Sequence, residues 1–152
     1  MLMILNDALL KHAVFTQITL KDNDKELSKE LKVKIMRIRM MYNKIKNKFD
    51  SDIKEFMSEL ITDDLRDLAT KQDRTPEEEK LFLEVSEKLD KEHNEFIKQK
   101  ILEEVSVQDD SLSQNEYEEI VDINSGNKVV INGNSISAED FLELVYDLFV
   151  KE

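Results

Sequence analysis

The apolar positions between Ser28 and Leu60 recur at steps of four and three residues, and this repeat predicts one long helix. The mean step of about 3.6 residues keeps the apolar stripe on one face of a straight helix. No Gly or Pro interrupts the stretch. Such a helix needs a partner along most of its length, because packing supplies most of a helix's stability. The stripe consists of Leu31, Ile35, Ile38, Tyr42, Ile45, Phe49, Ile53, Phe56 and Leu60.

A second long helix is predicted to begin at Thr75. Thr75 is a suitable N-cap, Pro76 takes the first helical position, and Glu78 completes a capping box. Apolar residues then follow at helical spacing as far as Val105. This helix is long enough to lie back along the first one.

The two long helices are expected to form an antiparallel hairpin. Their connection holds a shorter helix that starts at Thr62 or Asp63. We expect the apolar stripes of residues 31–60 and 81–105 to face one another. The aromatic side chains expected to be buried are Tyr42, Phe49 and Phe82.

The segments that flank the hairpin are shorter. Asn6 is expected to cap a first helix that ends near Ile18, and residues 21–24 form a polar connection to the long helix. Alternation of apolar and polar residues indicates that a strand starts at Val105 or Val107.

The last part of the chain predicts a small α/β cap. Ser113 opens a short helix, and the β-branched residues 128–131 predict a strand. Asn132 and Gly133 are the strongest two-residue signal for a hairpin turn, and Ser137 caps a final helix.

The fold class is therefore mainly α: a long antiparallel helical hairpin with a short N-terminal helix and a small C-terminal β-hairpin plus helix. We divide it into a hairpin domain, residues 1–107, and a cap, residues 108–152, packed on it as one structural unit. Only two Gly and one Pro occur among 152 residues, which agrees with a helical chain.

The absence of Cys excludes a disulfide framework and a thiolate nucleophile or metal ligand. No apolar run approaches the roughly 20 residues that span a bilayer. Residues 1–5 lack the basic start of a signal peptide. We therefore expect a soluble intracellular protein, or one assembled inside a cell, with no membrane partner.

Charge is distributed unevenly along a chain whose net charge is −12. Residues 25–48 contain nine Lys or Arg and two Glu, whereas residues from 102 onward contain thirteen Asp or Glu and two Lys. A basic helix face can bind phosphates, but we favour a solvated face, because a long helix needs polar residues on the side opposite its apolar stripe. No aromatic residues alternate with the cations, so this face has no stacking platform for single strands. The candidate interaction residues on this face are Lys29, Lys32, Arg37, Lys44 and Lys48.

Four methionines of the long helix have two readings. They could form an adaptable binding surface, or they could fill the core, and we favour core filling. These residues are Met36, Met40, Met41 and Met57.

No catalytic constellation occurs in the sequence. His93 follows Asp90 by three residues, a spacing found in carboxylate-bridged metal bundles, but His12 has no acid three residues before it. A carboxylate-bridged metal site requires a second such pair, which the sequence lacks. We therefore predict no catalytic, cofactor-binding or metal-binding residues, and no enzyme.

Short motifs along most of the chain resemble a family of small proteins encoded by tailed bacteriophages and prophages. In that family a short helix precedes a long basic helix, and no catalytic residues are established. The family's Gly-containing central loop is replaced here by residues 62–75. The motifs correspond here to Leu27-Ser28-Lys29 with Leu31, to Ile101-Leu102-Glu103-Glu104-Val105, and to Ile136-Ser137 with Phe141.

The resemblance implies a phage structural or virion-assembly protein that is not an enzyme and acts through protein–protein contacts. Its partners would be other phage particle proteins or copies of itself, in the host cell cytoplasm or the virion. The alternative is a nucleic-acid-binding or regulatory accessory protein that uses the basic helix of residues 25–48.

Overall fold

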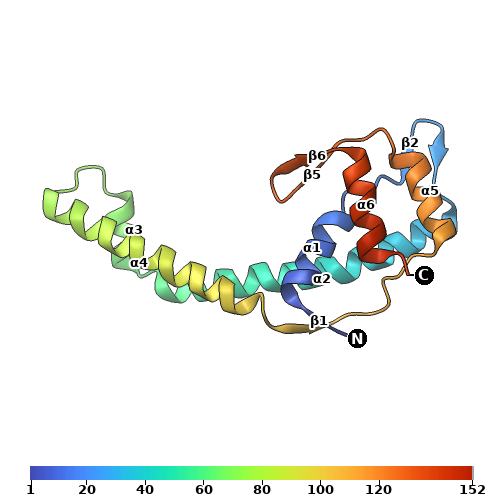
Figure 1. Ribbon diagram of the computed structural model, residues 1–152. Helices are drawn as coiled ribbons and strands as arrows, with labels where there is room; N and C mark the ends of the chain where they lie inside the picture. Colours follow the sequence, from blue (N-terminus) through green and yellow to red (C-terminus); the bar gives the residue numbers. More distant parts are fainter. Residues whose placement is uncertain (152) are drawn as a thin grey trace. The chain divides into compact units, whose positions relative to one another are not determined.

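A computed structural model describes residues 1–151 of the chain (Figure 1). This part of the chain contains six helices and three two-stranded antiparallel sheets, so the prediction of a mainly α fold with a small C-terminal β-hairpin is confirmed. The helices are α1 (Leu5–Phe15), α2 (Lys29–Leu60), α3 (Asp63–Thr70), α4 (Pro76–Lys100), α5 (Gln114–Asn124) and α6 (Ala138–Phe149). Strand β1 (Leu2–Ile4) pairs with β4 (Glu104–Ser106), β2 (Lys21–Asp22) with β3 (Lys25–Glu26), and β5 (Val129–Ile131) with β6 (Asn134–Ile136).

The chain divides into two compact units. The larger unit joins Met1–Lys46 to the chain from Glu104 onward, and the smaller unit is Asn47–Glu103. Helix α2 contributes residues to both. This grouping differs from the sequence-based division into residues 1–107 and 108–152, because the first part of α2 packs with elements from the end of the chain.

The core of the larger unit brings together both ends of the sequence. The ring of Phe15 on α1 lies 4.7 Å from that of Phe149 on α6. Tyr42 is completely buried in the same cluster, together with the first part of the α2 stripe. We predicted the second long helix as the partner of this half of the stripe. That prediction is wrong, because α1, α5 and α6 cover it instead.

The elements of the predicted cap are confirmed. Ser113 and Glu116 exchange both hydrogen bonds of a capping box at the start of α5. Asn132 and Gly133 adopt positive φ angles of 50° and 82° in the turn between β5 and β6. In strand β5, Val129 and Ile131 are buried, whereas Val130 between them is 55% exposed. The strand therefore buries residues on one face only.

The N-terminal segment differs from its prediction. Helix α1 begins at Leu5 with Ile4 at its N-cap, and Asn6 lies inside the helix. The reason is that residues Leu2–Ile4 are already engaged as a strand with β4. The polar residues after α1, which we predicted to form a connection, form the hairpin of β2 and β3, with Asn23 at a φ of 54°.

The smaller unit contains the hairpin proper. Thr62 caps α3, and Thr75 with Glu78 forms the predicted capping box of α4. The rings of Phe56 on α2 and Phe96 on α4 stack with their centroids 4.2 Å apart. Phe49 is buried as predicted, with 9% of its surface exposed.

Burial in α3 and α4 is nevertheless incomplete. No residue of either helix is buried, and Phe82, which we predicted to be buried, is only half-buried. The Arg74 guanidinium covers the ring of Phe82 at 4.1 Å from its centroid. The two long helices of this unit thus pack through stacked ring faces and an ion pair between Lys100 and Asp52.

Candidate functional site

The structure places all five candidate basic residues on α2, but it does not leave them equally available. Lys32 pairs with Glu26 at 3.2 Å, and Lys48 pairs with Asp52 at 2.9 Å. Within residues 1–151 the other three form no ion pair and have exposed side chains. These are Lys29, Arg37 and Lys44.

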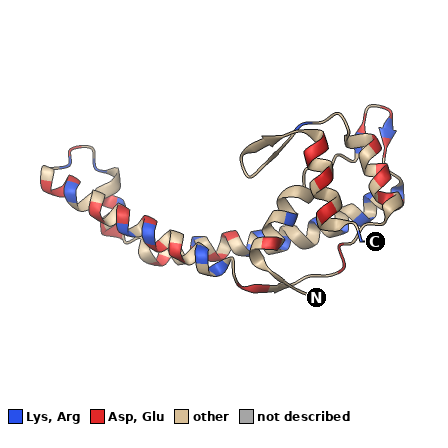
Figure 2. Ribbon diagram, viewed as in Figure 1, with Lys and Arg blue, Asp and Glu red and all other residues tan. Residues whose placement is uncertain are grey.

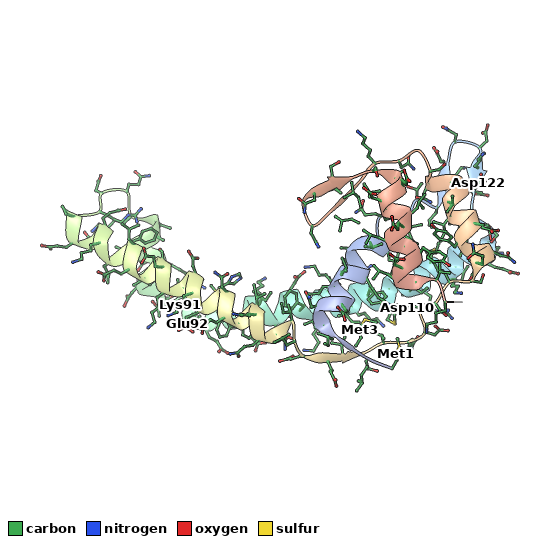
Figure 3. The ribbon with its side chains drawn as sticks, in the orientation of Figure 1. Met1, Met3, Lys91, Glu92, Asp110 and Asp122 are labelled. Carbon is green, nitrogen blue, oxygen red and sulfur yellow. The ribbon has the colours of Figure 1, made fainter. Side chains whose placement is uncertain are left out.

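Most other cations of the basic stretch are engaged inside the larger unit. Lys34 pairs with Glu116 at 2.7 Å, and Lys25 pairs with Asp122 of α5, labelled in Figure 3, at 3.5 Å. The Arg39 guanidinium donates to the backbone carbonyls of Phe15, the last residue of α1, and of Ile18 in the segment after it, and burial lowers the pKa of Arg39. The basic segment and the acidic end of the chain therefore neutralise each other in part.

The three unpaired cations share one face of α2 with apolar side chains. Positions 29, 33, 36, 40 and 44 follow one another at steps of three and four, which places them on a single helix face. Val33 is 59% exposed, Met36 54% and Met40 61%. This face lies opposite the buried stripe, so the first part of α2 has two apolar faces.

This second face forms one side of a groove of about 630 Å³. The segment after β4 forms the other side. There, the Gln108 backbone N–H donates to the Met41 sulfur at 3.0 Å and holds the segment beside α2. Val107 is buried at the base of the groove. The lining residues are Val33, Met36, Arg37, Met40, Met41, Lys44, Ile45, Ser106, Val107 and Gln108.

The preferred reading of the methionines is wrong for Met36 and Met40. Both side chains are exposed in the groove rather than packed in the core. Leu and Ile residues already fill the core-facing positions of α2, which leaves these methionines on the opposite side. Met41 is half-buried and packs against the core, and Met57 is half-buried in the smaller unit.

A buried polar cluster joins three segments of the larger unit. One carboxylate oxygen of Asp110 accepts a hydrogen bond from the Lys11 ammonium at 2.8 Å and another from the Tyr42 hydroxyl. Asp110 is 1% exposed and is labelled in Figure 3. Burial and the neighbouring Asp110 raise the pKa of the Tyr42 hydroxyl. Because Asp110 and Tyr42 are closed to solvent, we assign this cluster a structural role.

Asn124 is a second buried polar residue, with 1% of its surface exposed. Its amide donates to the carbonyls of Thr19 and Ile120, and its oxygen accepts from the Thr19 N–H at 2.8 Å. The Asn124 side chain therefore links the segment after α1 to the end of α5 by hydrogen bonds. The sequence offered no signal for either buried polar residue.

Neither histidine belongs to a metal-binding cluster among the described residues. The Nε2 atom of His12 lies 2.8 Å from the side-chain oxygen of Asn43, so the polar ring of His12 has a hydrogen-bond partner. Within residues 1–151 no three or more His, Asp or Glu side chains gather in a way that could hold a metal ion.

An acidic hollow of about 450 Å³ lies over α5 and α6. Its rings, Tyr117 and Tyr146, meet edge to face at 5.1 Å, and its carboxylates come from Glu139 and Glu143. Burial and the nearby carboxylates raise the pKa of Tyr117. Figure 2 shows acidic residues along α5 and α6, so this surface is opposite in charge to the groove.

Comparisons of the chain with protein-family models, with curated proteins and with solved structures found no match. No helix among residues 1–151 is both long enough and apolar enough to cross a bilayer.

Proposed function

We propose that this chain is a non-enzymatic structural or virion-assembly protein of a tailed phage, active in the host cell cytoplasm or the virion. The resemblance of its short motifs to phage proteins supports the phage part of the proposal. The second apolar face of α2 supports the part that concerns protein contacts.

The exposed apolar face of α2 is the observation that carries the proposal. Val33, Met36 and Met40 are each more than half exposed, next to one another, on a helix whose opposite face already fills a core. Contiguous apolar surface rimmed by polar residues is typical of protein interaction sites. Covering these three side chains would contribute about 3–5 kcal/mol before the costs of association.

Nucleic-acid binding is the second candidate, because Lys29, Arg37 and Lys44 lie on one face and have no ion-pair partner within residues 1–151. Three phosphate contacts would give a salt slope of about −2.7, which is a loss of about 40-fold between 50 and 200 mM salt. The apolar side chains between the cations have no role in phosphate binding. The protein-contact function therefore explains more of this face.

The test compares the parent with a Met36→Glu, Met40→Glu double variant in phage-infected cells. We expect particle proteins to co-purify with the parent and to be lost with the variant. A DNA mobility shift is measured with both proteins across a salt series. A tight, steeply salt-dependent shift by the parent, without particle proteins, would overturn the proposal and favour the nucleic-acid candidate.

A further inference from the structure

We infer that the groove between α2 and the segment after β4 binds one amphipathic α-helix of a partner protein, with carboxylates flanking its apolar stripe. This inference rests on the proposed function and names the chemistry of its partner. It is carried by the shape of the groove, its apolar floor and the charge of its rim.

The dimensions of the groove suit a helix. The groove extends about 18 Å along α2, from Val33 to Ile45, at 1.5 Å per residue, the length of about three helical turns. It has two sides, α2 and residues 106–108, so that a rod-shaped ligand would lie between them. Amphipathic helices bind in such grooves through apolar residues at positions i, i+3, i+4 and i+7.

The methionines of the groove suit an apolar helix face. Met36 and Met40 are unbranched and flexible, and Val33 extends the same apolar strip. Methionine side chains adapt to irregular apolar partners, which is why they are common on surfaces that bind helices. The half-buried Ile45 and the buried Val107 complete the floor.

The rim of the groove sets the charge of the partner. Arg37 and Lys44 line the groove, Lys29 lies on the same helix face, and none of them is paired within residues 1–151. Carboxylates on the flanks of a bound helix would pair with these cations. Complementary charge of this kind fixes register and suppresses unsuitable partners.

A second copy of the chain is a poorer occupant. In a twofold dimer formed through this face, each cationic rim would meet the same cationic rim, because such an interface is self-complementary. The acidic helix α6 turns its apolar residues Phe141, Val145 and Phe149 into the core, where at most 1% of each is exposed. It therefore presents carboxylates without an apolar stripe.

The experiment uses the full chain and a displayed peptide library. Each peptide is an amphipathic helix of about 16 residues, with Leu fixed at the apolar positions and Glu, Lys, Gln or Ala at the polar ones. We expect selection to enrich Glu at the flanks of the stripe. The Met36→Glu, Met40→Glu double variant should bind the selected peptides at least about tenfold more weakly.

A charge variant tests the rim independently. Arg37→Glu with Lys44→Glu should lose the acidic peptides and select Lys at the same flanking positions. The matched controls lie on α4: Leu83→Glu changes an apolar residue that is 54% exposed, and Lys91→Glu changes the exposed cation labelled in Figure 3. Both controls should bind the peptides as the parent does.

Three results would overturn the inference: no peptide enriched on the parent over the methionine variant, enrichment of Lys on the parent, or binding reduced equally by the controls.

Failure of this inference can be distinguished from failure of the proposed function. If particle proteins co-purify with the parent and with the methionine variant alike, the assembly function stands and the groove inference fails. If acidic helices bind but no particle protein co-purifies, the assembly function fails and the groove inference stands.

Discussion

The two units of this chain are stabilised in different ways. The larger unit has a closed core with completely buried rings and two buried polar side chains, Asp110 and Asn124. In the smaller unit no residue of α3 or α4 is buried, and the helices pack through stacked rings and ion pairs. Helix α2 passes through both with the same apolar spacing. Helical periodicity therefore indicates that a face is covered, but not how deeply.

The largest effect is expected from Phe141→Ala in the larger unit. Phe141 is completely buried, so the substitution leaves a cavity and should lower the free energy of unfolding by about 3–5 kcal/mol. Hydrogen exchange should accelerate in α1, α5 and α6. Val130→Ala, at a position that is 55% exposed, serves as the control and should change exchange little. Equal effects of the two would contradict the picture of a closed core.

Asp110→Asn should come next. The Asn amide is neutral, so the partly buried Lys11 ammonium would lose the carboxylate that lies 2.8 Å from it. We expect the free energy of unfolding to fall by about 1–3 kcal/mol. The pKa of Tyr42 should also fall, because Asp110 is one of the causes that raise it. Phenolate absorbance measured against pH checks this. Asp109→Asn changes an exposed neighbour whose carboxylate accepts two hydrogen bonds from Ser111, and it should leave Tyr42 unaffected.

Phe96→Ala tests the smaller unit. It removes a half-buried ring that stacks on Phe56, so we expect a loss of about 1–2 kcal/mol. Amide exchange in α4 should rise, whereas exchange in α5 and α6 should stay as in the parent. Accelerated exchange throughout the larger unit would show that the two units do not open independently.

The smallest effect is expected from Asp52→Asn. Hydrogen bonds from Lys48 and Lys100 lower the pKa of Asp52, and the pairs lie at the surface, so the loss should be below about 1 kcal/mol at neutral pH. A lowered pKa contributes stability that is present above the unfolded value of about 4 and is lost as the pH falls through the folded value. Thermal melts should therefore separate parent and variant at neutral pH and converge in acid. A difference that persists in acid would argue against the ion pairs.

Local signals in the sequence predicted local structure well. The capping boxes at Thr75 and Ser113 and the turn at Asn132 and Gly133 depend on neighbouring residues only, and all three are present. A strand at Val105 was also predicted. Its pairing with Met3 was not, because two three-residue strands so far apart in the chain share no local signal.

Only part of the candidate site could be predicted from the sequence. The basic face of α2 could be predicted from spacing, and three of its five cations do stay unpaired within residues 1–151. Spacing could not show that Met36 and Met40 form a second apolar face. A methionine fits a core and an exposed groove equally well, and the choice depends on residues 106–108, which come from elsewhere in the chain.

The larger unit is built from two separate parts of the chain, and this has a consequence for the newly made protein. The stripe from Leu31 to Tyr42 is covered by α1, which precedes it in the chain, and by α5 and α6, which follow only after the whole smaller unit. Ribosomes add about 5–20 residues per second, so the part of the stripe that α5 and α6 cover stays exposed for on the order of 5–20 s. The smaller unit, being continuous in the chain, can form during that interval. Synthesis thus brings the weakly packed unit to completion first and the tightly packed one last.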